Sequence, residues 1–264
     1  MKGLFTSVPA LLCLALFTIS ADAQDSSRFS HVTPEAFAKF EDHVQLDLLR
    51  LRLDPAAFRD EALFKYFVLL NNCSAPTHWV AENIDNEFEY PTIKKYYADH
   101  ASEILNSLPL ENVRTGGPSN SLLILGTYSR ERKEFPFVNA YSRDATPQTL
   151  EIHSWGTSIV SRDVIWGCAN RRMIRTHAQF PSYVVAREKL SFAAFPVEEQ
   201  AARRFVETSK HREFRLRIAS QILPLAPRRL ERGGFVSYEF SSTVTRIDVL
   251  TPDGEMISTL YVRK

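Results

Sequence analysis

The sequence predicts an α+β fold in which N-terminal helices pack on a mainly antiparallel sheet, with an inserted helix and a C-terminal β-hairpin. Apolar residues recur every three or four positions in the N-terminal third, which is the period of a helix. Short apolar or alternating runs follow from residue 121 onward, which is typical of strands. Because the strands are grouped after the helices, the order favours α+β over a doubly wound α/β sheet.

The composition is that of an ordinary globular protein. The 264 residues are 44% hydrophobic and 24% charged, and the net charge is +1, which argues against disorder. Only 9 glycines are present, which excludes collagen-like classes. We expect one α+β domain over residues 24–264. Two subdomains that meet near residues 111–118, where glycine and proline cluster, are the alternative.

The first 23 residues have the features of a secretory signal peptide. Lys2 supplies an early positive charge, and an apolar stretch is centred on residues 11–17. Ala21 and Ala23 put small side chains at the −3 and −1 positions of a cut after Ala23. The sequence therefore predicts an exported, bacterial-type protein that is periplasmic or secreted, with no transmembrane segment in the mature chain.

Three helices are expected before residue 110. Thr33, Pro34 and Glu35 form a start signal, since threonine caps, proline suits the first turn and an early acid suits the helix dipole. The apolar face that follows consists of Phe37, Phe40, Val44, Leu48 and Leu51. A second helix is expected from Asp54 to about Asn72, and a third from Pro91 to about Ser107.

The strands are expected at 121–128, 135–141, 150–153, 182–186, 214–218, 245–250 and 256–262. The inserted helix is expected over 197–210, because acids begin this segment and bases end it. Thr251-Pro252-Asp253-Gly254 has the residues of a tight turn, so the last two strands are predicted to form the C-terminal hairpin.

Cys73 and Cys168 are the cysteines that remain after the signal peptide. In an oxidising compartment they can form one disulfide, which would close a loop of roughly 95 residues and contribute about 4–5 kcal/mol. Two separate buried thiols are the alternative, since an unpaired cysteine packs as a small hydrophobic residue.

Charge is unevenly distributed along the chain. Residues 24–111 carry a net charge of −7, and residues 162–232 carry +8. Either the acidic helices neutralise the basic segment, or that segment binds an anionic envelope component or an acidic protein. Arg171, Arg172 and Arg175 are the candidate anion site, since guanidinium groups hold anions bidentately. Nucleic acid is not an expected partner.

No established catalytic motif is present in the sequence. His153, Asp163, Cys168 and His177 are weak candidates for a site that the fold would have to assemble. No metal site and no cofactor is predicted.

A further pair, His43 and Asp47, shares a helix face and is expected to be a solvated contact. We favour a non-enzymatic envelope or secreted binding or accessory module. The alternative is a hydrolase or metal-dependent enzyme that uses the four candidate residues.

Overall fold

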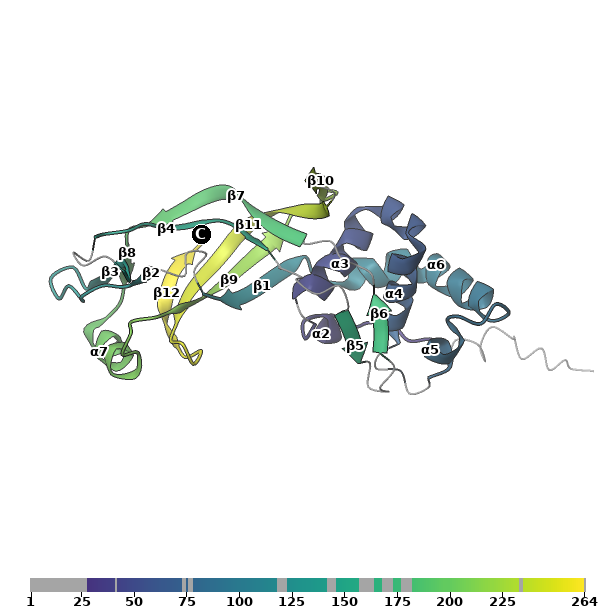
Figure 1. The fold of residues 1–264 in the computed structure, drawn as a ribbon, viewed down its shortest axis with the longest axis horizontal. Coiled ribbons are helices and arrows are strands. Elements are labelled where there is room, and N and C mark those ends of the chain that lie inside the picture. Colours follow the sequence, from purple (N-terminus) through teal and green to yellow (C-terminus); the bar gives the residue numbers. More distant parts are fainter. Residues whose placement is uncertain are drawn as a thin grey trace, which may run out of the picture.

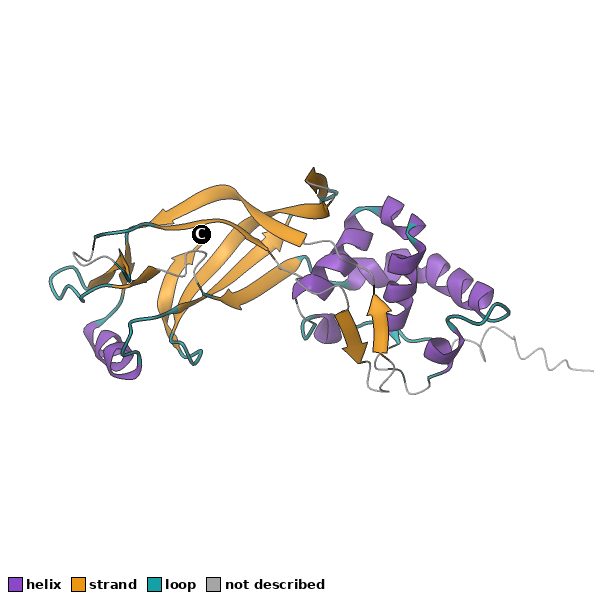
Figure 2. Cartoon of the chain, in the orientation of Figure 1, coloured by secondary structure: helices purple, strands orange, loops and turns teal. Residues whose placement is uncertain are grey.

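The computed structural model describes residues 28–40, 42–72, 75, 78–117, 123–141, 146–156, 164–167, 173–176, 182–232 and 235–263. The α+β class is confirmed: the chain is about 34% helix and 37% strand. Most of the helices gather at one end of an elongated molecule, and the large sheet occupies the other end (Figures 1 and 2).

The helical end contains five α-helices and one 3₁₀ helix within the described residues. They are α2 (Pro34–Phe37), α3 (Asp42–Leu53), the 3₁₀ helix η2 (Pro55–Arg59), α4 (Glu61–Asn71), α5 (Trp79–Asn83) and α6 (Tyr90–Ser107). The third predicted helix is confirmed as α6.

The first two predicted helices are each divided in the structure. The first divides into α2 and α3, and the second divides into η2 and α4. The second division has a clear cause. The carboxylate of Asp60 accepts hydrogen bonds from the backbone of Ala62 and Leu63, so it caps a new helix at Glu61.

The sheet end is built on seven strands in the order β1-β9-β11-β7-β4, with β10 and β12 also paired to β11. Its strands are β1 (Glu111–Gly116), β4 (Leu150–Gly156), β7 (Ser182–Phe192), β9 (Arg215–Ile222), β10 (Arg228–Arg232), β11 (Phe235–Leu250) and β12 (Met256–Val262). The β7–β11 pair is parallel and the other pairs are antiparallel, so the sheet is mixed but mainly antiparallel.

Two smaller sheets complete the described strands. They are β2 (Leu123–Leu125) with β3 (Glu134–Asn139) and β8 (Ala194–Pro196), and β5 (Val164–Gly167) with β6 (Met173–Thr176). The inserted helix is α7 (Glu199–Thr208), which agrees with the segment expected from the sequence.

The C-terminal hairpin is confirmed as β11 and β12. Gly254 has a φ of 98°, in the left-handed region that favours glycine. Its amide donates to the carbonyl of Thr251 over 3.0 Å, which closes the turn. The local turn residues and the alternating pattern therefore specified this element together.

One apolar core runs through both ends of the molecule. Helix α3 contacts β1 and β7, and the guanidinium of Arg50 lies 3.7 Å from the ring centroid of Tyr238 in β11. Residues 111–116, considered in the sequence as a subdomain boundary, form β1 and pair with β9. The division into domains stays a prediction. No helix in the described ranges is long and apolar enough to cross a membrane.

Candidate binding site

The seven-stranded sheet curls until the two ends of its strand order meet. Strands β1 and β4 stand at opposite ends of that order. The indole Nε1 of Trp155 in β4 nevertheless donates a hydrogen bond to Oδ1 of Asn112 in β1 over 3.3 Å. Both side chains are buried. In Figure 1, β4 and β7 run along one side of the sheet and β1 and β9 along the other. The curl therefore encloses an interior.

A cavity of about 200 Å³ lies in this interior, beside the Trp155–Asn112 contact. Three strands supply its walls. The described residues that line it are Arg114, Gly116, Gly117, Ile152, Ser154, Trp155, Leu216 and Ile218. The four apolar members of this set are all buried, so the cavity has an apolar interior with polar groups from β1 and β4.

The room in the cavity depends on the residues that β1 turns inward. Alternate residues of a strand share a face, so Asn112, Arg114 and Gly116 lie together. A Cβ atom added at Gly116 would meet one non-neighbouring atom within 4 Å, the Nε of Arg114 at 3.8 Å. The absence of a side chain at Gly116 therefore leaves space over the wall of the sheet.

Hydrogen-bond donors dominate the polar side of the cavity region. Asn112 is 1% exposed, and its Oδ1 already accepts from Trp155. Its Nδ2 has no hydrogen-bond partner among the described residues. Arg114 adds a guanidinium two positions along the same strand face. These groups favour a ligand that carries hydrogen-bond acceptors.

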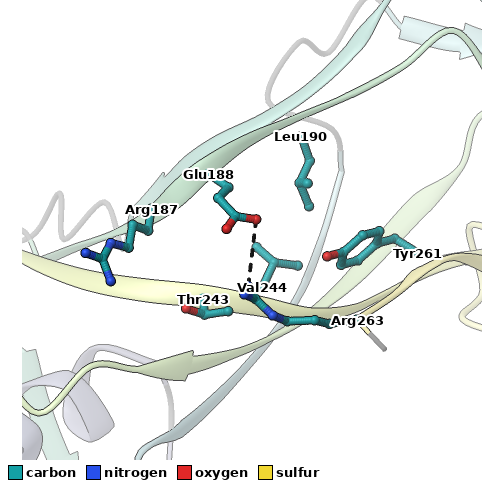
Figure 3. Close-up of a pocket in the computed structure, with 7 residues that line it drawn as sticks. All are labelled: Arg187, Glu188, Leu190, Thr243, Val244, Tyr261 and Arg263. Atoms are coloured by element: carbon teal, nitrogen blue, oxygen red, sulfur yellow. Dashed lines mark ion pairs between the residues drawn. The ribbon is translucent and has the colours of Figure 1, made fainter.

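A second hollow lies where β11 changes neighbours along one edge. Strand β7 pairs with β11 up to Ser242, and β12 pairs with it from Arg246. The volume between them is about 10 Å³, which suits one water molecule. Figure 3 shows Glu188 directed toward Arg263, with 3.7 Å between the paired atoms. This small hollow is a joint between strands and has no room for an organic ligand.

The candidate catalytic residues of the sequence are only partly described by the structure. His153 is exposed on β4, at the irregularity in its pairing with β7, between Ile152 and Ser154 of the cavity wall. Asp163, Cys168 and His177 lie outside the described residues. In the part of the chain that the structure describes, no group of three or more metal-ligating side chains is found.

The other predicted sites fall largely outside the described ranges. Arg171 and Arg172 are outside them, and Arg175 belongs to β6, where its backbone pairs with Ile165 of β5. The predicted disulfide is not described either, because Cys73 and Cys168 both lie outside the described ranges. The anion site and the disulfide stay predictions.

The expectation of a solvated His43–Asp47 contact is wrong for Asp47. This residue is buried in α3 with 8% of its surface exposed. Burial raises the pKa of its carboxyl group to about 7, although the nearby Arg50 acts in the opposite direction. The sequence missed this because the face of α3 that carries these polar groups packs inward.

The ion pairs of the described side chains neutralise each half of the molecule internally. At the helical end, Lys94 pairs with Glu61 over 2.6 Å. In the basic segment, Arg217 pairs with Asp248 over 2.8 Å and Arg228 pairs with Glu239 over 2.8 Å. The acids that meet these arginines come from β11, in the C-terminal half, whereas the sequence analysis considered the N-terminal helices.

No family model, no curated protein and no solved structure matches this chain. Its function is therefore argued from the geometry of the curled sheet.

Proposed function

We propose that this protein is an exported, non-enzymatic binding or accessory module that holds a small, partly apolar ligand inside its curled sheet. The observation that carries the proposal is the cavity of about 200 Å³ between β1, β4 and β9. An engineered apolar cavity of about 150 Å³ accepts benzene, so this volume suits a molecule of one ring or a short chain. A concave apolar site with a few convergent polar groups is the usual form of a ligand site.

The chemistry of the cavity wall supports binding over catalysis. The described lining residues include one hydroxyl group, that of Ser154, and no histidine, cysteine or carboxylate. A serine nucleophile needs an adjacent base, and the lining supplies none among these residues.

The second candidate function is a hydrolase or metal-dependent enzyme. It has one observation in its favour, the position of His153 on β4 between two residues of the cavity wall.

Export is supported by the way the chain begins to pack soon after the proposed cut at Ala23. The hydroxyl of Tyr97 donates to the carbonyl of Ser30 over 2.8 Å. The amide of Val32 donates to the Asn71 side chain over 2.8 Å. The mature chain would thus keep its first ordered contacts after removal of residues 1–23. Mass measurement of the protein from its native host tests the cut, and a retained Met1 would reject it.

The binding proposal is tested by filling the cavity from β1. Gly116→Leu places a side chain in the space beside Arg114, and Thr115→Leu adds the same side chain at an exposed position of the same strand. Ligand probes are benzyl alcohol, hexanol, phenylacetate and hexanoate, and the readout is the NMR shift of the Trp155 indole N–H.

We expect the wild type and Thr115→Leu to bind at least one probe. Gly116→Leu should bind it at least about tenfold more weakly, because the added side chain occupies the ligand volume. Circular dichroism establishes that each variant is folded. No binding of any probe by the folded wild type, or equal binding by Gly116→Leu, would contradict the proposal.

A further inference from the structure

We infer that the ligand of the curled sheet is a small carboxylate with an apolar group of about six to eight carbons, bound with its carboxylate toward Arg114 and Asn112. This inference rests on the proposed binding function and adds the chemical class of the ligand. It uses the size of the cavity, the type of polar group around it and the number of charges on its wall.

The size of the apolar group follows from the volume and the walls. The cavity of about 200 Å³ is bounded by the buried side chains of Ile152, Trp155, Leu216 and Ile218. Benzene fits a cavity of about 150 Å³, so the remaining space admits one or two further heavy atoms. A phenyl ring with a short acid group, or a short fatty acid, therefore fills the site.

The acceptor character of the head group follows from Asn112. Its Oδ1 accepts from the indole of Trp155, which fixes the orientation of the amide and leaves Nδ2 as the outstanding donor. A buried amide donor without a partner is unfavourable, so a ligand oxygen that accepts from it is favoured. Ligands that only donate hydrogen bonds find no matching group on this amide.

The single negative charge follows from the wall of β1. Arg114 is the one charged residue among the described lining residues, and no described carboxylate opposes it in the cavity. Arginine and carboxylate form two parallel hydrogen bonds, a geometry that favours a planar monoanion. Arg114 and Asn112 are two residues apart on one strand face, about 6–7 Å along the strand, so one carboxylate can lie between their donors.

The experiment compares matched ligands that differ in the head group. Phenylacetate is compared with 2-phenylethanol, hexanoate with hexanol, and phenyl phosphate serves as the dianionic arm. Affinities are measured by calorimetry and by the Trp155 indole shift, on the wild type and on Arg114→Gln, Arg114→Lys and Arg229→Gln. Arg229 is a matched control, since it is exposed and pairs with Glu231 away from the cavity wall.

We expect the wild type and Arg229→Gln to bind each carboxylate at least about tenfold more tightly than its alcohol. Arg114→Gln should lose this preference and keep its affinity for the alcohols. Arg114→Lys should keep part of the preference, because its charge remains and the two-pronged geometry does not. Gly116→Leu should weaken both members of each pair.

The outcomes separate this inference from the proposed function. Equal affinity of acids and alcohols, or tighter binding of phenyl phosphate, would overturn the carboxylate assignment and leave the binding function intact. No binding of any compound by folded wild type would reject both. If Arg114→Gln does not fold, the acid-to-alcohol ratio of the wild type still decides the ligand class.

Discussion

Asp47 shows how one buried carboxyl group makes stability depend on pH. Its pKa is raised from 3.8 to about 7 in the folded protein. Between these values the folded state keeps a proton that the unfolded state releases, so the free energy of unfolding falls as pH rises. Above pH 7 the loss is complete. A shift of this size corresponds to at most about 4 kcal/mol.

Replacing this group by a neutral isostere removes that pH dependence. We expect Asp47→Asn to be more stable than the wild type at about pH 8 and similar to it at about pH 4. Urea unfolding at both pH values measures the difference, with the exposed Asp99→Asn as control. A variant that is less stable than the wild type at pH 8 would indicate that Arg50 requires the charged partner.

Asp248 behaves in the opposite way. Burial alone would raise its pKa, but hydrogen bonds from Thr259, Arg246 and Arg217 outweigh burial and lower the pKa. Both carboxylate oxygens accept such bonds, at 2.7–3.1 Å. Its stabilising contribution is therefore present above the unfolded pKa of 3.8 and is lost as pH falls through the lowered folded pKa.

Asp248→Asn should cost about 2–3 kcal/mol at neutral pH, because it leaves two arginines without their shared anion. The value is set below that of a fully buried pair, since both arginine side chains are partly exposed. Chemical denaturation measures it. Glu199→Gln, which breaks a pair on the surface of α7, is the control and should change little. Equal effects of the two substitutions would argue against the Asp248 cluster as a stabilising element.

At the scale of elements, the segment before α2 is attached to α6 through aromatic and polar contacts. Phe29 stacks on Tyr96 with 3.8 Å between ring centroids, and Nε2 of His31 lies 3.0 Å from the Tyr96 hydroxyl. Burial first, and then the neighbouring His100, lowers the pKa of His31 below 6.5. This contribution to docking is complete above pH 6.5 and is lost as pH falls toward the folded pKa.

Acidification should therefore loosen residues 28–32 before it affects α6 itself. Hydrogen exchange from about pH 8 to about pH 5.5, corrected for intrinsic rates, should show lower protection of this segment at the acidic end. His31→Asn should remove that pH dependence, and His211→Asn, an exposed control, should keep it. Unchanged protection of the wild-type segment across this range would contradict the prediction.

Local sequence signals predicted the elements that depend on them. The hairpin of β11 and β12 was predicted because alternation and the Thr251–Gly254 turn agree. Strand β1 was missed because its inward residues, Asn112, Arg114 and Gly116, give no apolar alternation. The same three residues shape the candidate site. The Trp155–Asn112 contact spans 43 residues, so no local pattern in the sequence announces it.

At the scale of the whole molecule, the two ends are joined mainly by apolar packing. The core cluster runs from the helices into the sheet, and the ion pairs described above lie within each half. The opposite net charges of the two halves in the sequence suggested an electrostatic junction. Composition gives the amount of charge in a segment, but the fold decides which acid meets which base.

Strand β11 also determines when this protein can fold. It pairs with β7, β9, β10 and β12, so the centre of the large sheet is a segment that begins at Phe235 in a chain of 264 residues. A ribosome has made almost the whole polypeptide before these pairings can form, and its exit tunnel still holds the newest residues. The sheet therefore assembles after synthesis ends, from contacts that are distant in sequence and slow to form. For a chain proposed to cross a membrane during export, this delay preserves the unfolded, threadable state that translocation requires.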